Sequence, residues 1–277
     1  MRYGKQRITC LTILILLVTS SLVYGFRNND TKVYTSSSPS IVLQEILRGN
    51  KEFTLQHNNQ YFEPFLDNQT PNLTVVTCSD SRVHTNLFGI DPNNRIFAIR
   101  NIGNQITNSE GSVDYGIRHL ATSILMVMGH SNCGAIKAAM SDYSDKTHGI
   151  KSELSPLKTP LGSDPGWGSF NERWAKNIER NVDYQVSYAQ KTYQDKVKSG
   201  ELIIIGAVYD FNNMYEKGRG ALVITNINGE TNPDKFMKHS AMRFLTKNEI
   251  IARIGSLAPQ AVFKESPVAY GYHPRQQ

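Results

Sequence analysis

Residues 73–82 read Leu-Thr-Val-Val-Thr-Cys-Ser-Asp-Ser-Arg. The first five residues are apolar or β-branched and predict a short buried strand. Cys78 follows directly, with Asp80 and Arg82 at alternate positions after it. Ligand sites in open α/β sheets gather at the carboxyl ends of the strands. This stretch therefore predicts both a core strand and a functional site where that strand ends.

A second strand with polar residues at its end lies further along the chain. The apolar run Ile124–Met128 is followed by His130-Ser131-Asn132-Cys133. Two thiolates and one imidazole form a ligand set that selects zinc, and three protein ligands leave one tetrahedral position open, as in catalytic sites. We therefore predict one Zn²⁺ per chain, held by Cys78, His130 and Cys133.

The first 25 residues are typical of an export signal. Three basic residues precede the apolar run Leu11–Val18, and Gly25 is a small residue at the expected cleavage point. The apolar run is shorter than the ~20 residues that span a bilayer, although retention of the signal as an anchor stays open. We expect a mature chain of 277 − 25 = 252 residues that is exported, either periplasmic or secreted.

Charge and length limit the remaining possibilities. Loss of the signal removes three basic residues and no acidic one, so the formal net charge falls from +6 to +3. A charge this small argues against a nucleic-acid partner, and no second apolar run predicts a stable membrane span. We divide the chain into a signal peptide (1–25), a polar linker (26–39) and a single catalytic zinc domain (40–277).

Alternative interpretations of the cysteines remain open. Cys10 lies in the signal, so the mature chain holds Cys78 and Cys133 alone, and an exported chain with two cysteines ordinarily forms one disulfide. A structural zinc in a non-catalytic exported protein is a further alternative. The nearby Asp80 and Arg82 favour a catalytic site, because a bidentate ion pair between them would keep the carboxylate ionised and off the metal.

The order of the elements predicts an α/β fold. Four short apolar runs read as strands: Leu73–Thr77, Arg95–Ile99, Ile124–Met128 and Leu202–Val208. Helical patterns alternate with them, which indicates a mainly parallel sheet. Other predicted segments are an opening helix (41–56), helices over 109–120, 135–141 and 170–198, a surface loop (146–167), an edge strand (221–226), a helix (236–254) and an irregular tail after residue 259.

The two cysteine-containing motifs resemble the zinc motifs of the β-class carbonic anhydrases. The matching stretches are Cys78–Val83 and Gly129–Ala135, and Leu43–Phe53 is similar to the opening helix of that family. Arg100–Asn104 and Gly206–Asp210 resemble two further family elements. The likeness covers roughly residues 40–210, and it implies a mainly parallel central β-sheet flanked by helices, with an N-terminal helical arm.

The resemblance also implies an activity. It implies reversible hydration of carbon dioxide to bicarbonate and a proton by zinc-bound hydroxide, with Asp80 and Arg82 as the catalytic dyad. Gln69, Phe97 and Tyr115 occupy the positions that line the substrate pocket in the plant-like subgroup. The family places this pocket at a protomer interface, which implies a homodimer or higher homo-oligomer. Hydrolysis of a carbon dioxide analogue such as carbon disulfide stays open as a related activity.

Two features depart from the family pattern. His84 follows the first motif, and it is either a solvent-facing histidine or a proton shuttle. Residues 211–229 are longer than the usual hairpin of the family, and we interpret them as surface decoration.

Overall fold

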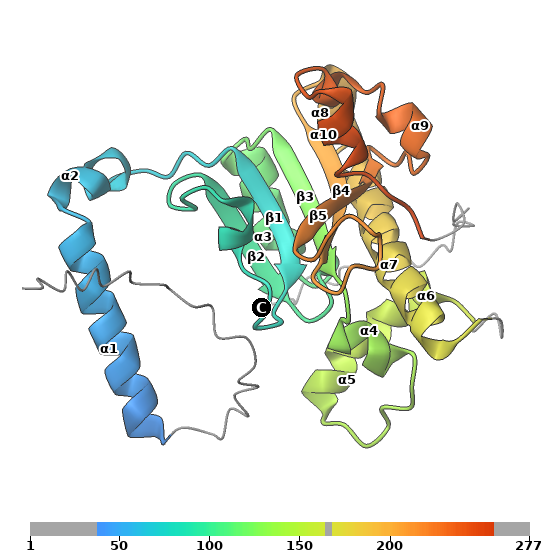
Figure 1. Ribbon diagram of the computed structural model, residues 1–277, viewed down its shortest axis with the longest axis horizontal. Coiled ribbons are helices and arrows are strands. Elements are labelled where there is room, and N and C mark those ends of the chain that lie inside the picture. Colours follow the sequence, from blue (N-terminus) through green and yellow to red (C-terminus); the bar gives the residue numbers. More distant parts are fainter. Residues whose placement is uncertain (1–37, 164–167, 258–277) are drawn as a thin grey trace, which may run out of the picture. The chain divides into compact units, whose positions relative to one another are not determined.

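Figure 1 shows the computed structural model, which describes residues 38–163 and 168–257. Contacts divide the chain into two compact units, with the boundary between Phe62 and Glu63. The predicted signal, nearly all of the predicted linker and the predicted irregular tail lie outside the described residues. Within the described ranges, no helix combines the length and the apolar character that crossing a membrane requires.

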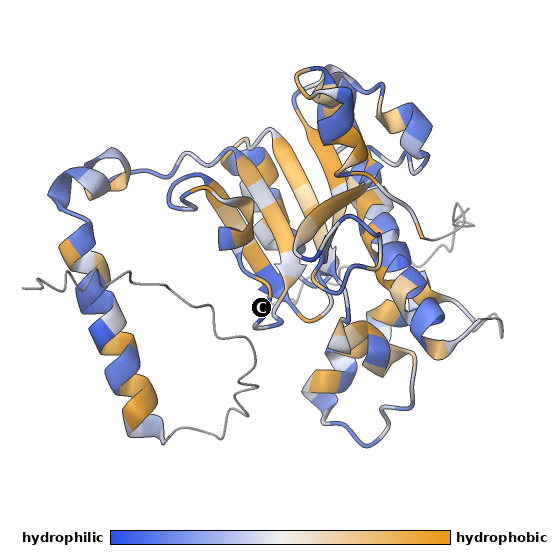
Figure 2. Cartoon of the chain, viewed as in Figure 1, coloured by the Kyte–Doolittle hydropathy of each residue, from blue (hydrophilic) through white to orange (hydrophobic). Residues whose placement is uncertain are grey.

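The N-terminal unit contains helices α1 (Pro39–Gln56) and α2 (Asn59–Phe62). Helix α1 confirms the predicted opening helix, and Pro39 fits its first turn, where the missing N–H has no helical partner to lose. Figure 2 shows apolar residues along this helix. They remain solvent-exposed in the chain, and the largest of them are Ile41, Val42, Leu43, Ile46, Leu47, Phe53 and Leu55.

The C-terminal unit is built on a five-stranded sheet with the order β2-β1-β3-β4-β5. Strands β1 (Leu73–Cys78), β2 (Ile96–Asn101), β3 (Ile124–His130) and β4 (Ile203–Asp210) are parallel to their neighbours in this set. Strand β5 (Ala221–Ile227) runs antiparallel to β4 at the edge. The predicted mainly parallel sheet and its edge strand are both confirmed.

The two faces of this sheet are covered differently. Alternate residues of the strands, among them Val76, Leu125 and Ile204, face a large core to which helices α3 (Glu110–Asp114), α4 (Gly134–Ala139) and α7 (Phe170–Thr192) contribute. The other face holds a smaller cluster around Val75, Met126 and Ala207, packed with residues of the short helix η2 (Thr85–Phe88). Several apolar side chains on this second face are only partly buried: Ile205, Tyr209 and Leu222.

The helical patterns between the strands form shorter elements than predicted. Helix α3 continues into the π-helical turn η3 (Tyr115–His119), which together cover the predicted 109–120 segment. The long helix predicted over 170–198 is divided into α7 and α8 (Gln194–Ser199), with Tyr193 between them. Ser169 caps α7 in a reciprocal pair with Glu172, which fixes the start of this helix.

The surface loop predicted over 146–167 is wrong for most of its length. The structure has helix α5 (His148–Leu154), the 3₁₀ turn η4 (Ser155–Leu157) and helix α6 (Lys158–Leu161) there. Pro156 occupies the first turn of η4, where a proline is tolerated. Leu154, Leu157 and Leu161 are buried in the main core, so tertiary packing stabilises these short helices.

The single helix predicted over 236–254 is also wrong. Three short elements replace it: α9 (Pro233–Phe236), η5 (Ser240–Met242) and α10 (Lys247–Ile251). The side chains of His239 and Thr246 accept hydrogen bonds from backbone N–H groups and start η5 and α10. The apolar residues Phe236, Met242, Ile250 and Ile254 of this segment form a separate small core with Ile227 of β5.

Helix α7 carries buried carboxylates that join it to the C-terminal segments. Glu179 accepts hydrogen bonds from the Tyr215 hydroxyl (2.7 Å) and from the backbone N–H of Leu257 (2.8 Å). One turn later, Asp183 accepts a hydrogen bond from the Asn226 amide of β5 at 2.9 Å. Burial raises the pKa of Asp183 to about 7, and the negative charge of Glu179 adds to this effect.

This raised pKa predicts a pH-dependent loss of stability that Asp183→Asn removes. The folded chain holds the Asp183 proton up to about pH 7, whereas an unfolded aspartate releases it near pH 4. Relative to the variant, the free energy of unfolding of the parent chain should fall by about 1.4 kcal/mol per pH unit between these values and stay level above them. Urea unfolding at several pH values measures this. The exposed Asp234→Asn should show no such difference, and parallel pH profiles for the parent and Asp183→Asn would contradict the assignment.

Candidate metal centre and active site

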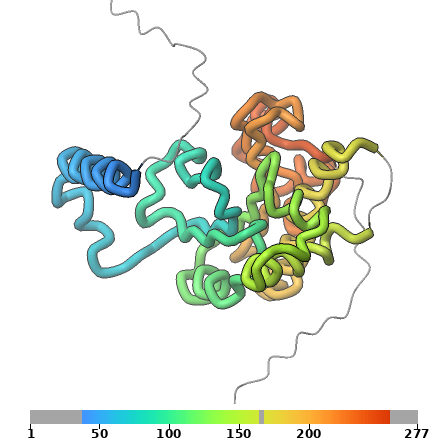
Figure 3. Tube along the Cα trace, turned by 90° about the horizontal axis from the view of Figure 1, so that it is seen from below, coloured from blue at the N-terminus to red at the C-terminus, as the bar shows by residue number. Residues whose placement is uncertain are grey.

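Three predicted ligands meet at the carboxyl ends of two neighbouring strands. Cys78 ends β1, His130 ends the neighbouring strand β3, and Cys133 is the residue before α4. Their two sulfur atoms and one imidazole nitrogen lie within 4.8 Å of one another, and all three residues are buried. Figure 3 views the C-terminal unit from the side on which β1 and β3 end.

The donor set fits zinc. Both cysteines are free thiols, so the structure contains no disulfide between them. His130 Nδ1 lies 3.0 Å from the Ser131 carbonyl oxygen, which places the ring proton on Nδ1 and leaves Nε2 as the lone-pair nitrogen. His130 Nε2 is buried without a hydrogen-bond partner among the described residues. A buried acceptor of this kind is costly unless a ligand satisfies it, and a zinc ion held by Cys78, His130 and Cys133 does so.

The two thiols are electrostatically unequal. A hydrogen bond from Cys133 lowers the pKa of the Cys78 thiol to about 4, despite the opposing effect of burial. The same hydrogen bond, together with burial, raises the pKa of Cys133 well above its ordinary value. Cys78 is therefore the more acidic thiol of the pair, and thiolate is the form that coordinates zinc.

Asp80 and Arg82 form a bidentate ion pair. Arg82 Nε donates to Asp80 Oδ1 at 2.8 Å, and Nη2 donates to Oδ2 at 2.6 Å. These hydrogen bonds hold the pKa of the Asp80 carboxyl well below its usual range. Asp80 Oδ2 also lies 3.8 Å from His130 Nε2. The pairing expected from the sequence thus places an ionised carboxylate beside the ligand nitrogen.

Arg82 is held by residues from two other segments. Its Nη2 donates to the Asn132 carbonyl oxygen at 3.2 Å, and its guanidinium carbon lies 4.7 Å from the centre of the Phe211 ring. Phe211 in turn stacks near His130, with ring centres 5.9 Å apart. Phe211 was not predicted as a site residue, because residues 211–229 read as surface decoration in the sequence. The available signal was its position directly after β4, the strand next to β3.

Backbone contacts fix the two cysteine-bearing loops. Arg100 donates from Nε to the Cys78 carbonyl oxygen (3.3 Å) and from Nη2 to that of Asp80 (2.9 Å). The Trp174 indole N–H donates to the Cys133 carbonyl oxygen at 2.9 Å. His84 is exposed, with its Nδ1 at 3.3 Å from Arg100 Nη1, so it lies on the outer side of this arrangement.

The residues expected to bind substrate lie at the other end of the sheet. Phe97 pairs with Thr74, four residues before Cys78, which corresponds to about 13 Å along the strand. The Tyr115 ring lies 5.8 Å from Phe97, and Tyr115 shares a cavity of about 730 Å³ with Gln69. Within one chain, these three residues are therefore together but apart from the metal ligands.

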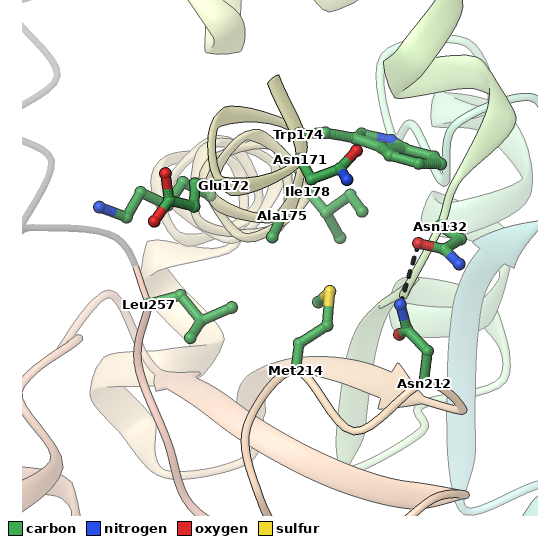
Figure 4. Close-up of a pocket in the computed structure, with 10 residues that line it drawn as sticks. Asn132, Asn171, Glu172, Trp174, Ala175, Ile178, Asn212, Met214 and Leu257 are labelled. Carbon is green, nitrogen blue, oxygen red and sulfur yellow. Dashed lines mark hydrogen bonds between the residues drawn. The ribbon is translucent and has the colours of Figure 1, made fainter. Parts of the chain in front are cut away.

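Another cavity lies against the loop between His130 and Cys133. Figure 4 shows Trp174, Asn132, Asn212 and Met214 around this space of about 610 Å³. The Asn212 amide donates to the Asn132 side-chain oxygen at 3.0 Å. None of the metal ligands lines this cavity, so it adjoins the site without containing it.

Comparison with known proteins places the chain in a family. The carbonic anhydrase family matches residues 73–216, which are 144 of the 277 residues. A carbonic anhydrase of Mycolicibacterium smegmatis is 28% identical over 147 residues, covering 51% of this chain and 71% of that protein. The mitochondrial beta carbonic anhydrase 6 of Arabidopsis thaliana is 30% identical over 164 residues, covering 52% and 55%.

A solved structure agrees with the fold. A tetrameric beta-carbonic anhydrase of Sordaria macrospora superposes with a TM-score of 0.55 at 25% identity, covering 61% of this chain and 92% of the other. The matched segment contains the strand ends that carry the two cysteines, the histidine and the aspartate–arginine pair. On the family match and this structural likeness, the chain belongs to the β-class carbonic anhydrases.

Proposed function

We propose that this protein catalyses the reversible hydration of carbon dioxide to bicarbonate and a proton. The observation that carries the proposal is the ionised Asp80, paired with Arg82 and placed 3.8 Å from the free ring nitrogen of His130. A structural zinc site needs no such carboxylate. Membership in the carbonic anhydrase family supports the same assignment.

Bound zinc would supply a Lewis acid that makes water nucleophilic near neutral pH. Asp80 contributes an acceptor that stays ionised, so it can hold the attacking water by one O–H group and direct its oxygen toward the carbon. A carbon–oxygen bond then forms, an O–H bond of the water breaks, and the released proton passes to buffer. Arg82 keeps Asp80 in place by two hydrogen bonds to Oδ1, from its backbone N–H and from Nε, and one from Nη2 to Oδ2, which leaves a lone pair of Oδ2 for the water.

Replacement of Asp80 tests this role directly. Asp80→Asn keeps the size of the side chain but removes its charge and weakens its hold on Arg82. We expect carbon dioxide hydration to fall by about 10²-fold or more, with zinc content unchanged, because none of the three ligands is altered. Stopped-flow hydration and zinc analysis on one sample measure both quantities. The exposed Asp234→Asn is the matched control, and undiminished hydration by Asp80→Asn would refute the role of Asp80.

We further propose that a second copy of the chain completes the substrate pocket, in the manner of the plant-like subgroup. Gln69, Phe97 and Tyr115 are too far along the sheet to reach the metal ligands of their own chain. The partly buried Ile205 and Leu222 on the second face of the sheet favour an apolar contact with another subunit. A homo-oligomer would thus bring these residues of one copy to the metal ligands of the other.

A mixing experiment distinguishes a shared pocket from one built within a single chain. Cys78→Ser and Gln69→Ala should each be strongly impaired alone. A mixed dimer of the two variants contains one site with an intact ligand set from one copy and an intact Gln69 from the other. Co-expression with random pairing should therefore restore about one quarter of the parental hydration rate, since half of the dimers are mixed and each has one working site of two. No recovery in verified mixed dimers would contradict the shared pocket.

Finally, we propose that the protein is exported. The basic residues before Leu11–Val18 and the small Gly25 support this assignment. Mass spectrometry of the protein from its native cells should give a chain that begins at Phe26. An intact N-terminus on a cytoplasmic protein would overturn the proposal.

A further inference from the structure

The segment from η5 to α10 exposes apolar and basic side chains together. Phe244 is 84% exposed and Leu245 is 44% exposed, although both are large apolar residues. They lie between Arg243 and Lys247, and Lys238 precedes them by a few residues. We call Lys238, Arg243, Phe244, Leu245 and Lys247 the basic–apolar patch.

Cations outnumber carboxylates in and beside this patch. Its three cations line one cavity of about 440 Å³ together with His239, and no carboxylate lines that cavity. No ion pair is formed by these cations with the described parts of the chain. The acidic residue next to the patch, Glu249, accepts hydrogen bonds from the Thr246 backbone N–H and hydroxyl (both 2.7 Å). Arg243 stacks on the Phe244 ring, with its guanidinium carbon 4.6 Å from the ring centre, so the patch presents a cation directly beside its most exposed apolar side chain.

A folded platform supports the patch. Phe236, Met242 and Ile250 from α9, η5 and α10 are buried together, and Ile254 forms a bridge with Ile224 of β5. The patch residues themselves are exposed, so their replacement leaves this small core intact.

The patch lies away from the metal ligands. The small core packs on Ile203, at the amino end of β4, whereas His130 pairs with Tyr209 near the other end of that strand. Six residues of strand separate these positions, or about 20 Å. Figure 1 shows α9 and α10 at the end of the sheet opposite to the loops that follow β1 and β3. A large surface bound at the patch would leave the metal-binding edge open.

We propose that the basic–apolar patch docks the protein on an anionic lipid surface. Phe244 and Leu245 would enter the interface between headgroups and acyl chains, and Lys238, Arg243 and Lys247 would face the headgroup phosphates. An acidic protein partner could pair with the same cations, but it would need a hollow shaped for the protruding Phe244. A fluid lipid interface accepts such a side chain without a matching shape. This difference favours a lipid surface over a protein as the partner of the patch.

Vesicle sedimentation of the full chain tests the charge requirement. The parent should bind vesicles of phosphatidylcholine with 30% phosphatidylglycerol and lose binding as salt increases. The triple variant Lys238→Gln, Arg243→Gln, Lys247→Gln should bind about a hundredfold more weakly, at about fivefold per cation. The control triple variant Lys146→Gln, Lys151→Gln, Lys158→Gln removes the same charge from α5, α6 and the segment that precedes α5, and it should bind like the parent. Equal losses in the two triples would show attraction by net charge alone and overturn the proposal.

A local probe tests whether the patch itself contacts lipid, as distinct from contact by the apolar run Leu11–Val18. In Phe244→Trp, brominated phosphatidylcholine in the same vesicles should quench the new tryptophan, measured against the parent background. Phe244→Ser should weaken binding at least tenfold, whereas Ile150→Ser should not. Absence of quenching would overturn the proposal, as would binding of poly-glutamate that depends on the patch while vesicle binding does not. Because the patch contains no residue of the metal centre, carbon dioxide hydration in solution should be unchanged in the patch triple.

Discussion

The parallel pairing of β1 with β3 is the constraint on which the metal centre depends. Adjacent parallel strands end on the same side of a sheet, so Cys78 at the end of β1 and His130 at the end of β3 come together although a long crossover containing β2 and α3 separates them in the chain. Cys133 then follows within one turn and starts α4. Because the ligands belong to the sheet and its first turn, they are buried and fixed before a metal binds.

Charge at this edge is balanced by arginine. The acidic Cys78 thiol and the Asp80 carboxylate lie in one buried or half-buried region. Arg82 compensates for the charge of Asp80, and Arg100 holds the backbone carbonyls of Cys78 and Asp80. If the Arg82 contacts were lost, Asp80 would be free to turn toward a zinc ion held by Cys78, His130 and Cys133. The ion pair therefore keeps a strong oxygen donor near the metal but available as a base. Phe211 packs against the guanidinium, whose other side remains open to solvent.

The parts of the structure that could be predicted are those in which local pattern and tertiary packing agree. The strands were predictable because continuous apolar runs are typical of a sheet covered by helices. The ligands were predictable because Cys78 follows one of these runs, and His130 and Cys133 follow another. Residues 148–161 form helices that the prolines had argued against, since burial of Leu154, Leu157 and Leu161 outweighs weak local propensity. The position of Phe211 directly after a predicted strand became informative only once β4 was known to lie next to β3. The separation of Gln69 and Tyr115 from the metal ligands likewise became visible only with the sheet register.

The central claim is that three protein side chains hold a zinc ion and leave its fourth position to a non-protein ligand. X-ray absorption at the zinc edge of the purified full chain, compared with that of Asp80→Asn, tests this claim most directly. The account predicts two sulfur atoms at about 2.3 Å and two light atoms, one of them an imidazole nitrogen, at about 2.0–2.1 Å, with the same spectrum in both proteins. Loss of an oxygen neighbour in Asp80→Asn would show that Asp80 itself fills the fourth position. A chain that binds no zinc and contains a Cys78–Cys133 disulfide would contradict the account altogether.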